Sequence, residues 1–182
     1  MDNSWIIFCP SGFWQVKGIK EAGKLGMKTL AIDCNKKAEG FKHSDDYLCL
    51  DTNNHENIII ELKKKNINII GALSFCSDIG IELCAYIRSK FSIKGYGIET
   101  ARKLVNKHHQ RSEWEKAGLQ QNFKWKIFFD SNKAFEYLKG INSKKVLKPV
   151  DSSGSKGVLV YKKESEIEFN DIKNAFEFSR CK

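Results

Sequence analysis

The chain has 182 residues, 41% hydrophobic and 12% aromatic, which is the composition of a globular protein and excludes a disordered one. The net charge of +9 raises the question of nucleic acid, but the lysines are scattered and not clustered with aromatic residues, so no nucleic-acid partner is expected. Six cysteines without a C-x-x-C pair, and no signal peptide or membrane-length apolar run, predict a cytoplasmic protein with no membrane partner.

The first half of the chain alternates between short apolar runs and helical periodicity. Gly26 is placed to end the first helix, and Asn53 followed by Glu56 is typical of a capping pair before a later one. Because parallel strands need connections about as long as a helix, this order predicts an α/β domain with a Rossmann-like parallel sheet over residues 1–95. The expected strands are residues 5–9, 27–33, 47–51 and 67–75.

The order of elements changes after residue 95, and residues 96–182 are predicted to form a small α+β domain. Two helices come first, with Gly118 placed to end the second, and strands and helices then mix. The expected helices are residues 99–107, 110–117, 132–139 and a last one through 172–179. The expected strands are residues 124–129, 145–148 and 159–163.

The loop CPSGFWQVKG follows the first strand, at the edge of a parallel sheet where ligands bind. Ser11 and Gly12 are therefore candidate substrate-binding residues, although a tight turn explains Gly12 equally well. Asp33 lies at the distance along the chain expected for a ribose contact. The three-glycine dinucleotide fingerprint is absent, because Phe13 and Trp14 stand where the backbone would approach a pyrophosphate, so no nicotinamide or flavin cofactor is expected.

The loop SFCSDIG follows the fourth expected strand and reaches the same edge of the sheet. Ser77 and Asp78 are candidate substrate-binding residues in this loop. Both side chains can also cap the next helix, because their oxygens accept hydrogen bonds from the free N–H groups of a first turn. Capping and a substrate contact are both open interpretations.

The stretch VLKPVDSSGSKGV, residues 146–158, has the composition of a phosphate-binding loop. The Walker spacing is absent and a strand follows Gly157, so no helix N-terminus faces an anion here. Its small residues nevertheless allow several backbone N–H groups to converge on an anion, and Lys148 can reach the same oxygens. A plain hairpin with a flexible tip explains the same residues, so these residues alone leave both interpretations open.

The phrases KPVDSSGSKGV and NKHHQRSEWEKAGL together resemble the ATP-grasp superfamily. The similarity points to the group around the carbamoyl-phosphate synthetase large subunit, biotin carboxylase and carboxylate–amine ligases. Three further phrases resemble the same group, so the resemblance covers nearly all of the chain: AGKLGMKTLAIDCNKKAEGFKHSDDYLCLDT, FCSDIGIELCAYI and GYGIETARKLVNK. It implies a pre-ATP-grasp domain over residues 1–95 and the first ATP-grasp subdomain over residues 96–182.

The resemblance also implies ATP as the cofactor and assigns roles to individual residues. Lys107 matches the family's first basic position that contacts ATP, and Lys148 matches the second, which reaches the α- and β-phosphates. The implied chemistry is ligation, in which a carboxylate attacks the γ-phosphate and an amine or similar nucleophile then displaces phosphate from the acyl phosphate. The mobile lid over the β- and γ-phosphates is matched by Ser153, Gly154, Ser155 and Gly157.

In the ATP-grasp family ATP lies between two lobes, and the second lobe carries the adenine strand and the acidic and asparagine ligands of Mg²⁺. Nothing after Lys148 matches those residues, so the second lobe is expected to be missing, and no catalytic or metal-binding residue is assigned here. The implied partners are ATP, a small carboxylate and, for a split protein, a separate chain with the second lobe. We expect this truncated chain alone to bind ATP weakly without turnover, and the last helix to expose Phe176 or neighbouring apolar surface toward the missing lobe.

A second class of function stays open, a non-catalytic module for a small ligand or a partner, left as a degenerate or split ATP-grasp remnant. Three further polar residues of the NKHHQRSEWEKAGL phrase are interpreted as residues of a helix surface, namely His108, His109 and Arg111. The donor and acceptor substrates are not readable from the sequence.

Overall fold

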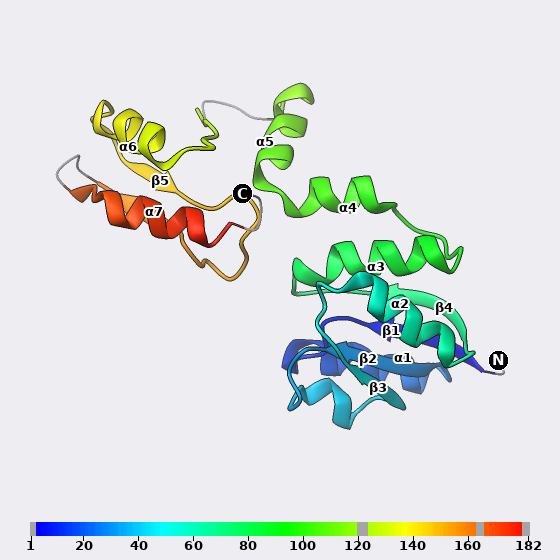
Figure 1. Cartoon of the computed structure of the whole chain (residues 1–182). Coiled ribbons are helices and arrows are strands. Elements are labelled where there is room, and N and C mark those ends of the chain that lie inside the picture. The colour runs from blue at the N-terminus through cyan, green and yellow to red at the C-terminus, as the bar shows by residue number, and fades with distance from the viewer. Residues whose placement is uncertain (1–2, 120–123, 163–165, 180–182) are drawn as a thin grey trace. The chain divides into compact units, whose positions relative to one another are not determined.

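The computed structural model describes residues 3–119, 124–162 and 166–179. The chain forms two compact units, unit 1 over residues 1–105 and unit 2 over residues 106–182 (Figure 1). Each unit has its own hydrophobic core, so each is described by itself.

Unit 1 is built on a four-stranded parallel sheet, whose strands are β1 (Ser4–Phe8), β2 (Lys28–Asp33), β3 (Asp46–Cys49) and β4 (Asn68–Leu73). The strand order is β3-β2-β1-β4, so the chain builds outward from β1 to β3 and then crosses back to place β4 on the other side of β1. Ligands of open α/β sheets bind where the order reverses, which here is between the loops after β1 and β4. This sheet confirms the predicted Rossmann-like α/β fold.

The strands of unit 1 are joined by the 3₁₀ turns η1 (Phe13–Gln15) and η2 (Glu39–Lys42) and the helices α1 (Val16–Lys24) and α2 (His55–Lys64). The helices α3 (Ile79–Lys90) and α4 (Ile98–Val105) follow the last strand, β4. On one face of the sheet α1 packs Ile19 against Phe8. On the other face α2 and α3 close the larger core, which includes Ile7 (Figure 1). Because successive side chains of a strand alternate between faces, Ile7 and Phe8 supply both cores.

The division between the units falls after Val105, ten residues later than the sequence-based boundary at Gly95. The reason is α4, which packs along α3 and fully buries Ala101. The chain between these helices is also held to α3, since the guanidinium of Arg88 lies 4.3 Å from the ring centroid of Tyr96. The composition changes near residue 96, but the packing changes only after α4.

The described elements of unit 2 are α5 (Lys107–Lys116), α6 (Ser131–Lys139), β5 (Lys145–Leu147), β6 (Leu159–Tyr161) and α7 (Phe169–Glu177). The two strands pair antiparallel. One face of this small sheet packs with α6 and α7 around the fully buried Ile172, and it includes Leu147 and Tyr161. Val146 and Val160 oppose each other on the other face and are 56% and 52% exposed. The sheet of unit 2 is thus covered on one side within this unit.

The predicted strand at residues 124–129 does not form. These residues run beside the end of β5 and line a cavity with it, but they make no ladder of strand hydrogen bonds. The side chains of this segment pack on the helix α6 instead, since the ammonium of Lys126 lies 4.4 Å from the ring centroid of Tyr137.

Helix ends were predicted with mixed success. Gly26 and Gly118 both follow a helix with positive φ angles of 78° and 67°, as expected for helix-ending glycines. The cap of α2 is Asn54, whose side chain accepts from the backbone N–H of Asn57, and not Asn53. Asn53 instead donates from its backbone N–H and from its side-chain amide to Oδ1 of Asp51. No described helix has the length and apolar character to cross a membrane.

Candidate functional site

The predicted substrate residues of unit 1 lie at the carboxyl edge of the sheet, but Ser11 is fully buried. Its backbone N–H donates to Oδ2 of Asp33 at 2.8 Å, and its hydroxyl donates to the carbonyl of Phe8 at 2.8 Å. Its own carbonyl accepts from the N–H of Gly40 at 2.8 Å. Ser11 therefore fixes the loop after β1 and has its polar groups engaged inside the protein.

Asp33 is the partner that holds this loop. Its second oxygen, Oδ1, accepts from the N–H of Asn35 at 2.9 Å, so both carboxylate oxygens receive a backbone donor. A carboxylate in this position stabilises the turn and is not directed at a ribose hydroxyl. The sequence correctly placed Asp33 at the end of the second strand, but its hydrogen bonds are structural ones.

The loops after β1 and β4 are joined at the point where the strand order reverses. Gly12 begins η1, and the buried Gln15 at its end donates from Nε2 to the carbonyl of Phe75 at 2.6 Å. Gly80 lies so close to the first loop that a Cβ there would stand 1.9 Å from the carbonyl oxygen of Cys9. The structure thus brings Gly12 and the loop containing Ser77 to one place, and leaves their role in substrate binding a prediction.

Asp78 occupies the N-cap of α3, but its side chain makes no capping hydrogen bond and is exposed. The carbonyl of Ser77 accepts from the hydroxyl of Ser74 at 3.0 Å. The expected side-chain capping by Asp78 is therefore absent. A substrate contact of Ser77 or Asp78 stays a prediction.

In unit 2, Lys107 opens α5 directly beside the small-residue loop. The helix start is capped by Asn106, whose Oδ1 accepts from the N–H groups of His108 and His109 at 3.0 and 3.2 Å. The backbone N–H of Lys107 donates to the carbonyl of Val150 at 2.7 Å. Its ammonium donates to the carbonyl of Ser152 at 2.5 Å. The first predicted lysine thus contacts the chain directly before the predicted lid residues.

The small-residue loop is tied at both ends and open at its tip. The hydroxyl of Ser152 donates to the carbonyl of Lys156 at 3.0 Å, which closes the loop on itself. Gly154 and Ser155 are exposed and have φ angles of 64° and 58°, and Gly157 has a φ of 71°. Three left-handed residues in so short a loop turn its backbone away from the regular strand ladder. The strand-loop-strand order expected from the sequence is correct.

Lys148 follows β5 at the start of this loop, and two other cations act on it. Partial burial lowers the pKa of its ammonium, and the positive charges of Arg111 and Lys107 lower it further. Like charges gathered in this way repel one another and favour an anion between them. Lys107, Arg111 and Lys148 therefore form a cationic group, which we call the cation cluster, beside the small-residue loop.

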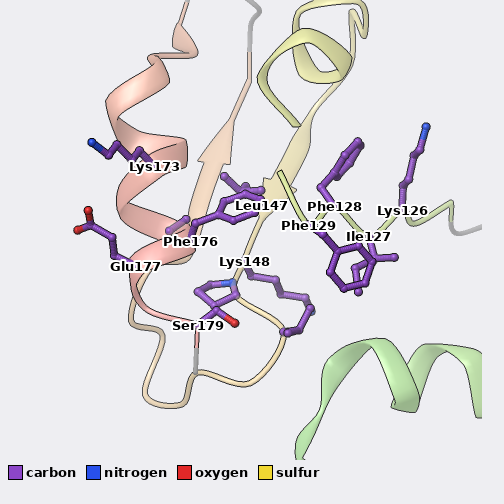
Figure 2. Close-up of a pocket in the computed structure, with 13 residues that line it drawn as sticks. Lys126, Ile127, Phe128, Phe129, Leu147, Lys148, Lys173, Phe176, Glu177 and Ser179 are labelled. Carbon is purple, nitrogen blue, oxygen red and sulfur yellow. The ribbon is translucent and has the colours of Figure 1, made fainter. Parts of the chain in front are cut away.

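An apolar cavity of about 430 Å³ adjoins Lys148. Figure 2 shows Leu147 and Phe176 on one side of it and Ile127 and Phe129 on the other, with Lys148 between them at the end of β5. The cavity has the size and apolar walls of a small-molecule pocket. Lys148 is the residue shared by the cavity and the cation cluster, so an anion with an apolar part fits the two together.

Among residues 3–119, 124–162 and 166–179, no three histidine, cysteine or acidic side chains gather in a way that could hold a metal ion. Glu168 and Asp171 lie at the start of α7.

Arg111 lies on α5, none of whose residues is buried, as expected for a helix surface, and its positive charge also acts on Lys148. His108 differs from its interpretation as a surface residue: it is half-buried, with its ring centroid 5.2 Å from that of Trp125, whereas His109 is exposed as expected. Phe176 is partly buried in the core of unit 2, and the neighbouring apolar surface expected at the last helix is that of Phe178, which is 50% exposed.

Comparison by sequence gives no relative: no model of a known protein family matches the chain, and no curated protein does. Comparison of folds does give matches. Phosphoribosylglycinamide synthetase from Anaerococcus prevotii aligns over 97% of this chain and 42% of its own, with a TM-score of 0.61 and 21% identity. L-amino acid ligase from Bacillus licheniformis aligns over 94% and 42%, with a TM-score of 0.71 and 16% identity.

N5-carboxyaminoimidazole synthetase from Staphylococcus aureus, in complex with ADP, aligns over 96% of this chain and 46% of its own, with a TM-score of 0.75 and 12% identity. The chain therefore spans less than half of the length of these solved proteins. At these identities the likeness concerns the fold. The chain has the fold of the N-terminal portion of ATP-grasp ligases, as the resemblance implied.

Proposed function

We propose that this chain is the N-terminal part of an ATP-dependent ligase that activates a carboxylate as an acyl phosphate and joins it to an amine or similar nucleophile. The observation that carries the proposal is the cation cluster of Lys107, Arg111 and Lys148, gathered beside the small-residue loop. The shared fold with ATP-grasp ligases supports it, and so does the ADP complex of the synthetase from S. aureus.

In this proposal the chain positions ATP and neutralises its charge. Lys148 and Lys107 bind phosphate oxygens, and the N–H groups of Ser153, Gly154, Ser155 and Gly157 close over the terminal phosphates. A substrate carboxylate oxygen attacks the γ-phosphorus, the bond to the β-phosphate oxygen breaks, and ADP leaves with that electron pair. An amine then attacks the acyl carbon, loses a proton and expels inorganic phosphate. Fixed charges and backbone donors suit such a transfer, because its demands are positioning and charge stabilisation.

In the proposal, the purine base lies on apolar surface beside the cation cluster. The cavity next to Lys148, lined by Leu147 and Phe176, offers such a surface. Mg²⁺ supplies charge neutralisation between phosphates in reactions of this kind, and no group of three histidine, cysteine or acidic side chains gathers among the described residues. The metal ligands and the second wall of the base therefore belong, in the proposal, to a second ATP-grasp lobe, on further sequence or on a separate chain.

Half of a nucleotide clamp binds weakly, because the phosphates keep their mutual repulsion and the base is covered on one side. We expect calorimetric titration of the 182-residue chain with Mg-ATP to show weak one-to-one binding and no turnover. Lys148→Ala should weaken that binding roughly tenfold or more, as loss of a charged hydrogen bond does. Lys144→Ala, which removes an exposed lysine just before β5, is the matched control.

Two results would count against this proposal. Equal affinity in the parent, Lys148→Ala and Lys144→Ala would remove the assigned phosphate site. Tight binding, or ATP hydrolysis that disappears in Lys148→Ala, would show that the chain needs no second lobe.

A non-catalytic ligand-binding or interaction module is the second candidate. The observation that favours it is the contact of Lys107 with the carbonyl of Ser152, which gives this lysine a protein partner in place of a phosphate. If the chain is such a module, joining it to the second lobe of an ATP-grasp ligase should produce no ATP turnover.

A further inference from the structure

Unit 1 exposes an aromatic pair at the carboxyl edge of its sheet. Phe13 and Trp14 are 71% and 72% exposed, and their ring centroids lie 5.6 Å apart with an angle of 78° between the rings. This is an edge-to-face pair of the kind that aromatic side chains form in cores and binding sites. Here it faces outward, although both rings would gain from burial.

The pair is held outward by a rigid turn. Phe13 and Trp14 belong to η1, which Gln15 anchors through its side-chain bond to Phe75 at 2.6 Å. Beside this turn, the ring of Phe75 packs so closely on α1 that a Cβ on Gly18 would stand 2.4 Å from it. The backbone of η1 is thus held in place, with both rings exposed.

The position of the pair is that of a ligand site. The turn η1 follows β1, beside the reversal of strand order where open α/β sheets bind small molecules. The adjacent strand β2 ends at the same edge, and its loop exposes Lys36 and Lys37. Within the described part of the chain these lysines have no ion-pair partner. Aromatic faces and exposed cations at one edge favour a planar apolar anion.

The surface area of the aromatic pair is large enough for a small molecule but too small for a stable protein interface. An aromatic side chain offers roughly 150–250 Å², so two of them fall short of the roughly 800 Å² that each side of a stable protein interface buries. The same area matches one or two stacked rings.

We propose that Phe13 and Trp14 form a binding platform for an aromatic carboxylate, whose ring stacks on the pair and whose carboxylate is drawn toward Lys36 and Lys37. The inference goes beyond the proposed function, because it assigns a ligand class to unit 1 by itself. It makes Phe13 and Trp14 the residues that select this ligand.

Fluorine NMR of 5-fluorotryptophan-labelled protein tests the platform. The chain has four tryptophans, so Trp14 is assigned with Trp14→Phe, while Trp5 in β1 serves as an internal reference. Titration with indole-3-acetate or phenylacetate should shift the Trp14 resonance with at least about tenfold higher affinity than acetate. Phe13→Ala should weaken the binding about 5- to 10-fold, and Phe13→Tyr should keep it. An unchanged Trp5 resonance verifies that each variant is folded.

Leu25→Ala is the matched control, because Leu25 is an exposed apolar residue of unit 1, 66% exposed, at the end of α1 away from η1. Equal affinity for acetate and indole-3-acetate would overturn the proposal. So would equal loss in Leu25→Ala and Phe13→Ala, or a Trp14 shift that tracks dimer formation in sedimentation. The ATP titration separates the two ideas. ATP binding without aromatic carboxylate binding rejects the platform alone, and the reverse rejects the ligase alone.

Discussion

The two units of this chain use their polar groups in opposite ways. In unit 1 the groups around the sheet edge satisfy one another, since Asp33 accepts from two backbone N–H groups and Ser11 is bonded at its N–H, hydroxyl and carbonyl. In unit 2 three cations lie within range of mutual repulsion beside a loop with an exposed tip. The polar groups at the sheet edge of unit 1 are already hydrogen-bonded to one another, whereas the cations of unit 2 repel one another and would be stabilised by an added anion.

This difference shows where binding energy for an anion can come from. A satisfied hydrogen-bond network gains little from a new partner, because each new bond replaces an existing one. A group of like charges gains directly when an anion arrives. For the same reason the platform inferred in unit 1 relies on exposed rings and not on its buried polar groups.

The largest effect is expected from Gly80→Ala, which tests how tightly the edge of unit 1 is built. A Cβ at Gly80 would lie 1.9 Å from the carbonyl of Cys9 and 2.4 Å from the hydroxyl of Ser74, so the two loops must separate. We expect a loss of about 3 kcal/mol or more in the free energy of unfolding. Gly23→Ala has no atom within 4 Å and should gain about 0.5–1 kcal/mol. Urea unfolding followed by circular dichroism measures both.

If Gly80→Ala and Gly23→Ala were equally stable, the edge of unit 1 would be deformable, and the comparison with unit 2 would not hold.

A smaller effect is expected from Gly157→Ala, at the closed end of the loop in unit 2. Its φ of 71° strains any side chain, and a Cβ there would stand 2.9 Å from both Phe178 and Pro149. Gly154→Ala has a similar φ of 64° but open space around it. We expect losses of about 2–3 kcal/mol for Gly157→Ala and about 1 kcal/mol for Gly154→Ala. Hydrogen exchange of peptides spanning residues 145–161 gives the local stability.

Equal losses in the two variants would mean that the contacts of Gly157 with Phe178 and Pro149 do not restrain this end of the loop.

The smallest effect is expected from Lys148→Met, which removes the repelled charge. The pKa of Lys148 is lowered below 10.5 by partial burial and by Arg111 and Lys107, so between the folded and unfolded pKa values the unfolded chain binds more protons. Stability must therefore rise with pH in that window, and at pH 7 the charge opposes folding. Lys148→Met should raise Tm by about 1–2 °C at pH 7, with the gain fading above pH 10.5.

Lys144→Met, an exposed lysine of the same unit, should leave Tm unchanged at both pH values. A Tm that falls in Lys148→Met would show that the side chain stabilises unit 2 by packing, and that the cation cluster is not strained.

The fold of unit 1 was predictable because its signals are local. Each strand is a short apolar run, and Gly26 marks a helix end by its backbone conformation. What joins these elements was not predictable. The bond between Ser11 and Asp33 spans 22 residues, and the need for glycine at position 80 comes from the carbonyl of Cys9, far away in sequence. Neither of these long-range contacts produces a recognisable pattern within a short stretch of sequence.

Unit 2 was harder to predict for two physical reasons. Its strands are three residues each, so residues 124–129 looked as much like a strand as β5 itself. The site residues Lys107 and Lys148 were assigned by resemblance, and the structure adds their electrostatic proximity without testing their role. Arg111 was correctly placed on a helix surface, but its effect on the charge of Lys148 was not predicted, because Lys148 comes from another part of the chain.

The ammonium of Lys107 already has a protein partner, the carbonyl oxygen of Ser152. An ammonium has three N–H donors, so one can stay on this carbonyl while the others receive an anion. In the proposed function, a phosphate bound at Lys107 would therefore be linked to the loop through a single nitrogen, and it would restrain the loop's first residues.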